Sequence, residues 1–145
     1  MTPDQRALLD RINTEVNALP YEAIATQPEP PDYYTDTPQV GHSWECRDYV
    51  QRKGTLLKAA GWPDPVNLVE LLCYVETGEH HGVLQLFDPA MPPPAALIYD
   101  SRCPDIYVLD SRFPTIYQRS APPPGYRWDA VQVAGTMPIQ WEKLT

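Results

Sequence analysis

The chain lacks both a membrane-spanning segment and a recognisable export signal. No part of its 145 residues approaches the roughly 18 consecutive apolar residues of a transmembrane helix. The first segment, MTPDQRALLDRINTEVNALPY, is charged and amphipathic, without the basic and apolar regions of a signal peptide. These absences predict a cytoplasmic protein that does not associate with membranes.

Basic residues and cysteines are also scarce. The net charge is −8, and a negative protein is repelled by phosphate backbones, so nucleic acid is not an expected partner. The cysteines, Cys46, Cys73 and Cys103, are odd in number and far apart, which favours free thiols in a reducing compartment. No C-x-x-C or H-x-x-x-H spacing indicates a zinc site.

Proline, by contrast, is abundant, at 18 of 145 residues, well above the average of about 5%. The prolines cluster, as in residues 28–38 and 89–94, which predicts ordered loops there. These loops either border a substrate groove or serve as rigid connectors. The hydrophobic fraction of 43% and the length predict a single folded domain over residues 1–145.

Two helices are expected before any strand. The first covers residues 3–19, with Thr2 as cap, Pro3 at the first position and Pro20 as the stop; its apolar residues recur at helical spacing: Leu8, Leu9, Ile12, Val16 and Leu19. The second starts near Trp44 to Cys46, after Ser43 as the cap, and runs to about Ala60, before Gly61 and Pro63.

Short runs rich in Val, Ile, Leu and Tyr follow the helices. They are residues 66–76, 80–88, 96–101, 105–111 and 117–120, and the tail 127–144 adds a last strand or edge segment. Helices followed by a meander of strands predict an α+β fold with an antiparallel sheet.

Three residues have the side chains that a thiol hydrolase needs: Cys46, His81 and Asp110. Attack requires a thiolate, which a helix N-terminus and a neighbouring imidazole both favour. A carboxylate on the far ring nitrogen then fixes the imidazole. A catalytic arrangement requires the Cys46 sulfur and the His81 ring near hydrogen-bonding distance.

Each candidate also has a plainer interpretation. A cysteine before a helix is often a small packed residue. The adjacent histidines His80 and His81 are also typical of an exposed surface or a turn, and Asp110 is typical of a turn. Asp100, in IYDSRCPD, repeats the local pattern of Asp110, so spacing alone does not choose between them.

Five segments in order carry a family resemblance: INTEVNALPYE, DYYTDTP, WECRDYVQRKGTLLKAAGWP, HHGVLQL and YVLDS. Together they resemble the bacterial transglutaminase-like cysteine peptidases, whose pattern has G-D-C-E-D-Y opening a helix, then H-A-V-L and L-D-N. The resemblance spans roughly residues 12–111. It implies a papain-like or transglutaminase-like core, in which a nucleophile helix packs on an antiparallel sheet.

The resemblance also implies roles for individual residues. Cys46 takes the nucleophile position, His81 rather than His80 matches the family histidine, and Asp110 rather than Asp100 matches the family aspartate. The implied activity is cleavage of an amide bond in a polypeptide; acyl transfer to an amine differs only in the acceptor. The alternative is a weak or inactive member that serves as a binding or assembly component, since small members resemble phage-encoded proteins with roles in the virion or tail.

The sequence departs from the family pattern around the nucleophile. Adhesin-releasing members bind calcium through acidic residues on both sides of the cysteine. Here Glu45 keeps one acid, Arg47 replaces the other, and Trp44 replaces a glycine. A guanidinium has no acceptor atom and does not ligate a cation. We therefore expect no calcium and no other cofactor.

Overall fold

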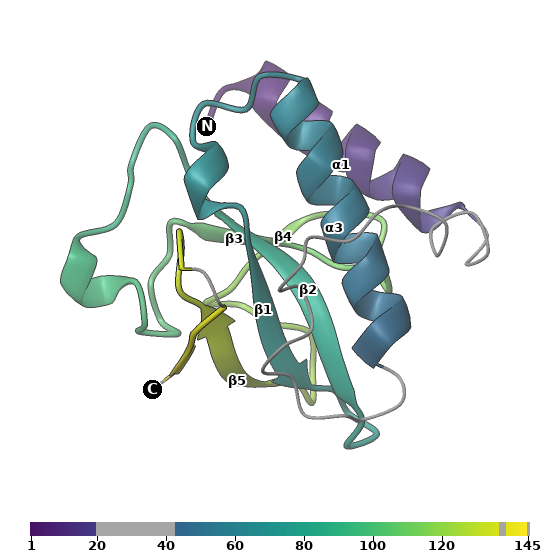
Figure 1. The fold of residues 1–145 in the computed structure, drawn as a ribbon, viewed down its shortest axis with the longest axis vertical. Helices are drawn as coiled ribbons and strands as arrows, with labels where there is room; N and C mark the ends of the chain where they lie inside the picture. The colour runs from purple at the N-terminus through teal and green to yellow at the C-terminus, as the bar shows by residue number, and fades with distance from the viewer. Residues whose placement is uncertain (20–42, 137–138, 145) are drawn as a thin grey trace.

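Over the residues that the structure describes, the fold is α+β, with two α-helices and a six-stranded antiparallel sheet (Figure 1). The computed structural model describes residues 1–19, 43–136 and 139–144, without the side chains of residues 43–45 and 47. The proline-rich segment 28–38 therefore lies outside the described residues. This architecture confirms the predicted α+β class.

Helix α1 covers Pro3–Asn17, and its start confirms the capping prediction. The Gln5 amide donates to the Thr2 hydroxyl at 3.1 Å, and the Thr2 amide donates back to Gln5 Oε1 at 2.9 Å. This reciprocal capping box satisfies two backbone donors that the first turn leaves free. The helix buries Leu9, Ile12 and Val16.

Helix α3 covers Ser43–Ala59, so Cys46 is its fourth residue. The helix thus includes Ser43, which was expected as its cap, and begins slightly earlier than the predicted start near Trp44 to Cys46. The helix ends as predicted at Gly61, whose φ of 80° suits glycine. The Gly61 amide donates to the Lys58 carbonyl and the Trp62 amide to the Leu57 carbonyl, a Schellman motif that satisfies the last carbonyls.

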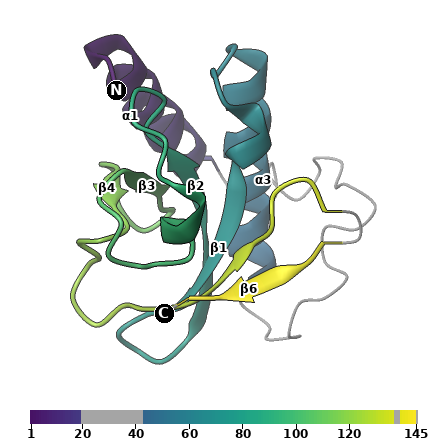
Figure 2. The same ribbon diagram turned by 90° about the vertical axis from the view of Figure 1, so that its left-hand side faces the viewer.

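The strands are β1 (Val69–Tyr74), β2 (His80–Phe87), β3 (Ile106–Leu109), β4 (Tyr117–Gln118), β5 (Arg127–Gln132) and β6 (Trp141–Lys143). Their order across the sheet is β4-β3-β2-β1-β5-β6. The first four form a meander, but β5 returns to pair with the free edge of β1, and β6 extends that side (Figure 2). The tail therefore supplies two strands.

The helices cover one face of the sheet and lie side by side in both ribbon views (Figures 1 and 2). Leu84 and Leu86 of β2 pack with both helices in the larger core cluster. Val83, the residue before Leu84, joins a second cluster made largely from strand residues, because neighbouring side chains on a strand face opposite sides. Every residue of β2 is consequently buried.

The strand expected over residues 96–101 is wrong. Ala95–Leu97 form a short 3₁₀ helix, η2, and turns follow it. The Arg119 guanidinium donates hydrogen bonds to the Ile98 carbonyl at 2.8 Å and to the Asp100 carbonyl at 2.6 Å. These two acceptors are therefore not available for strand pairing. Prolines at 92–94 and 104 lack the amide hydrogen that a ladder needs. Within the described parts of the chain, no helix has the length and apolarity to cross a bilayer.

Candidate active site

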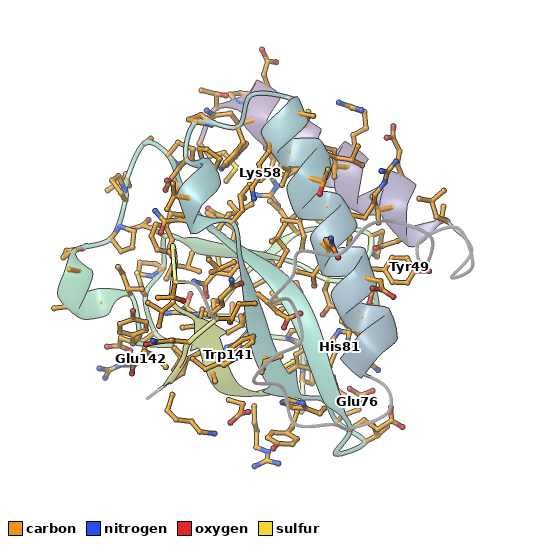
Figure 3. All side chains as sticks on the ribbon, in the orientation of Figure 1. Tyr49, Lys58, Glu76, His81, Trp141 and Glu142 are labelled. Atoms are coloured by element: carbon orange, nitrogen blue, oxygen red, sulfur yellow. The ribbon has the colours of Figure 1, made fainter. Side chains whose placement is uncertain are left out.

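Cys46, His81 and Asp110 form a continuous hydrogen-bonded row. The Cys46 sulfur lies 2.9 Å from Nδ1 of His81. On the other side of the ring, Nε2 of His81 lies 2.8 Å from Oδ1 of Asp110. Both distances are within hydrogen-bonding range. Figure 3 shows His81 beside the first half of α3, the helix that carries the cysteine.

The sheet explains how these three residues meet, although Cys46 and His81 are 35 positions apart in the chain and His81 and Asp110 are 29 apart. His81 is the second residue of β2, and Asp110 follows the last residue of β3. The two strands are neighbours, with Leu84 paired to Leu109. Helix α3 packs on β2 through the larger core cluster, so its first turns reach the start of that strand. Each side chain thus projects from a supported element.

The Asp110 carboxylate is fully buried and saturated with donors. Oδ1 accepts from His81 and from the backbone amide of Arg112 at 2.9 Å. Oδ2 accepts from the hydroxyls of Tyr117 at 2.8 Å and Tyr126 at 2.9 Å. Burial alone would raise the pKa of Asp110, but the hydrogen bonds, led by that from His81, hold this pKa below its usual value. Asp110 is therefore a carboxylate.

His81 is a buried imidazole between two acidic groups; only 4% of the residue is exposed. Burial by itself lowers its pKa, but the hydrogen bonds to Asp110 and Cys46 outweigh burial and raise the pKa to about 9. Because an ionised carboxylate only accepts, Nε2 must carry a hydrogen. Nδ1 is thereby left to exchange a proton with the Cys46 sulfur.

The raised pKa of His81 predicts lower stability in alkaline solution. A histidine whose pKa rises from 6.5 to about 9 on folding contributes stability that is complete below the lower value and disappears as the pH passes the higher one. The free energy of unfolding is therefore expected to fall across this range, by at most about 3 kcal/mol. Urea denaturation at several pH values measures the fall. His81→Gln should remove most of it, and an equal fall in that variant would contradict the assignment.

The row opens onto a cleft of about 360 Å³. Cys46 and His81 line it together with residues of both charges and with polar side chains: Asn17, Tyr49, Thr77, Glu79, Ser111 and Arg112. A larger cavity, about 430 Å³, lies elsewhere against α3, and none of the three residues lines it. The smaller cleft is the one that gives a reactant access to the sulfur.

The competing candidates have other partners, although His80 also lines the cleft. His80 pairs with Asp129 at 3.3 Å and packs on the Tyr74 ring, with ring centres 5.0 Å apart. Asp100 forms an ion pair with exposed Arg102 at 2.8 Å. The other two thiols, Cys73 and Cys103, are buried, and burial raises the pKa of Cys73. Among the three cysteines, Cys46 is the partly exposed one.

Sequence reasoning missed several residues around the row. Tyr117 and Tyr126 belong to no motif, and only the fold brings their hydroxyls to Asp110. Lys53 could have been identified from the sequence, because it is a charged residue among apolar residues that recur at helical spacing. It is 1% exposed, and burial lowers its pKa to about 7, against the opposing effect of Asp110 and Cys46. A buried amine thus lies near the proposed nucleophile.

The predictions about metal binding rest on atoms outside the described set, since the side chains of Trp44, Glu45 and Arg47 are not described. Among the side chains that are described, no group of three or more His, Cys, Asp or Glu is arranged to hold a metal ion.

Comparisons of this chain with protein-family models, curated proteins and solved structures give no match. The resemblance to transglutaminase-like peptidases therefore stays a prediction from the sequence.

Proposed function

We propose that the protein is a thiol hydrolase of the cysteine peptidase type, with a papain-like or transglutaminase-like core, that cleaves an amide bond in a polypeptide. The observation that carries this proposal is the row from Cys46 through His81 to Asp110, with contacts of 2.9 and 2.8 Å beside an open cleft. A core of this kind has its nucleophile on a helix and its histidine and aspartate on an antiparallel sheet, as in this fold.

In the first half of the reaction, His81 takes the Cys46 proton at Nδ1, and the thiolate attacks the amide carbonyl carbon. The imidazolium returns this proton to the leaving nitrogen as the carbon–nitrogen bond breaks, which leaves a thioester on Cys46 and a free amine. Asp110 stays ionised throughout and stabilises the imidazolium. The Cys46 backbone amide supplies one donor to the oxyanion.

The second half consumes one water molecule. His81 takes a proton from water at Nδ1 while the water oxygen attacks the thioester carbonyl. Collapse of the tetrahedral intermediate breaks the carbon–sulfur bond, releases a carboxylic acid and regenerates the Cys46–His81 pair. An amine in place of water completes acyl transfer by the same steps. The net charge of −8 favours a neutral or basic polypeptide as the substrate.

A second candidate function is binding or assembly without catalysis, including a role in a phage virion or tail. It is supported by the loop after β2, where Met91 is 61% and Leu97 40% exposed. Large exposed apolar side chains are among the features of protein contact surfaces. Neither Met91 nor Leu97 lines the cleft, so a test of thiol reactivity separates the two functions.

The proposed function predicts one fast thiol among three. Iodoacetamide should alkylate Cys46 rapidly at neutral pH, because His81 accepts its proton, while buried Cys73 and Cys103 react slowly. Mass spectrometry of peptides from timed samples measures the three rates from pH 5 to 10. Protein unfolded in urea is the control, since all three thiols should then react alike. Three slow and similar thiols in the folded protein would favour the binding function.

A further inference from the structure

Two tyrosines enclose the side of Asp110 that faces away from His81. Tyr117 comes from β4 and Tyr126 directly precedes β5, so the two approach from strands on opposite sides of β2. Their hydroxyls lie 2.8 and 2.9 Å from Oδ2. Neither tyrosine is among the residues that line the cleft. Both reach the site through Asp110, and Tyr126 also meets the His81 ring edge-on, with ring centres 6.3 Å apart.

The direction of the Tyr126 hydroxyl is fixed by its contacts with Arg112. Its oxygen accepts from Nη1 of Arg112 at 3.1 Å, and the Arg112 guanidinium lies over the Tyr126 ring at 5.6 Å. The same guanidinium holds the Glu76 carboxylate, with one contact of 2.8 Å. Since the Tyr126 oxygen already accepts a hydrogen from Arg112, its own hydrogen points to Asp110.

A glycine allows Glu76, the partner of Arg112, to lie close to Tyr126 in this way. Gly125 has a φ of 84°, and a Cβ built on it would lie 2.6 Å from the Cβ of Glu76. Glycine, which has no side chain, is the residue that both adopts this positive φ readily and leaves room for Glu76. The turn that carries Glu76 thereby lies directly against the residue before Tyr126.

We propose that Tyr117 and Tyr126 are positioning residues for the reaction: they occupy Oδ2 of Asp110, so that Oδ1 holds Nε2–H of His81 and Nδ1 stays directed at the Cys46 sulfur. This inference rests on the proposed function. Without the phenol hydrogens, a fully buried carboxylate has an oxygen with no donor, which costs free energy. The carboxylate then rotates or takes up a proton, and either change weakens its hold on the His81 imidazolium.

The test replaces each phenol with a phenyl ring. Tyr117→Phe and Tyr126→Phe are each expected to slow alkylation of Cys46 at neutral pH by about tenfold, and the double variant by about 100-fold. The rate should recover at high pH, where the thiol ionises without help. Tyr107→Phe is the matched control, because Tyr107 packs against the larger core cluster and away from Asp110; its rate profile should equal that of the wild type.

Proton NMR supplies a measurement that is independent of catalysis. The Nε2–H of His81, held on a carboxylate at 2.8 Å, should give a low-field resonance that weakens or moves in the double variant and persists in Tyr107→Phe. Slow Cys46 alkylation in the wild type overturns the proposed function, and this resonance then still tests the positioning role. Fast wild-type alkylation with an unchanged pH profile in both Phe variants overturns the positioning role alone.

Glu76→Gln keeps the test decisive if the Phe variants do not fold. This substitution leaves both phenols in place and weakens the exposed pair that holds Arg112. It should slow Cys46 alkylation by a few-fold, as expected for loss of one surface ion pair. If neither Phe variant folds, an unchanged rate of Cys46 alkylation in folded Glu76→Gln also overturns the proposal.

Discussion

Cys46→Ala is expected to abolish acyl-enzyme formation. With p-nitrophenyl acetate as the probe, the wild type should release a burst of p-nitrophenolate close to one equivalent per chain as the Cys46 thioester forms. Loss of a nucleophile typically lowers turnover by about 10⁴-fold or more. The variant should therefore show no burst, and stopped-flow absorbance measures it. The small ester makes the test independent of the natural substrate.

The matched control is Cys103→Ala. Cys103 is buried beside Phe87 and Ile106, in a cluster separate from the cleft. Its loss leaves a small cavity and lowers stability modestly, while the burst should remain. A burst that persists in Cys46→Ala, or one that both variants lose at temperatures where both are folded, counts against Cys46 as the nucleophile.

Local signals in the sequence were sufficient for the helices and for much of the sheet. A capping box fixes the start of α1 and a glycine stop fixes the end of α3, because these interactions involve residues close in sequence. The alternation of apolar and polar residues predicted the strand β2, but it did not predict that both faces of this strand are buried. That burial depends on the helices on one side and on a cluster of other strands on the other.

The errors arose where distant residues decide the backbone. Residues 96–101 have the composition of a strand, yet Arg119, some twenty positions later, binds two of their carbonyls. The place of β5 beside β1 likewise depends on pairing across more than fifty positions, as between Leu72 and Ala130. Propensity contains no information about such partners.

The residues of the candidate site likewise fall into those that the sequence predicted and those that only the fold reveals. Cys46, His81 and Asp110 were named from residue type, order and resemblance, and the fold brings these three together. Tyr117 and Tyr126 were not named, because a phenol that supports a carboxylate has no local pattern. Asp100 and Asp110 share a local pattern, and their different roles emerge only from what surrounds each of them: exposed Arg102 for one, a buried imidazole for the other.

This contrast between the two aspartates gives a decisive pair of variants. Asp110→Asn keeps the shape of the side chain but removes the charge that stabilises the His81 imidazolium. It also introduces an amide group that competes as a donor with Nε2–H, which favours the wrong tautomer. We expect the rate of the p-nitrophenolate burst to fall by about 10³- to 10⁴-fold, as for loss of the orienting carboxylate in a triad.

Asp100→Asn removes the same charge from an aspartate whose pair with Arg102 is at the surface, so stability should change little and the burst should not change. Stopped-flow rates from pH 5 to 10 distinguish the causes. Loss of the imidazolium partner should shift the rising limb of the Asp110→Asn profile to higher pH, whereas simple loss of folded protein lowers the amplitude at every pH. Equal rates in the two variants would show that Asp110 does not orient His81.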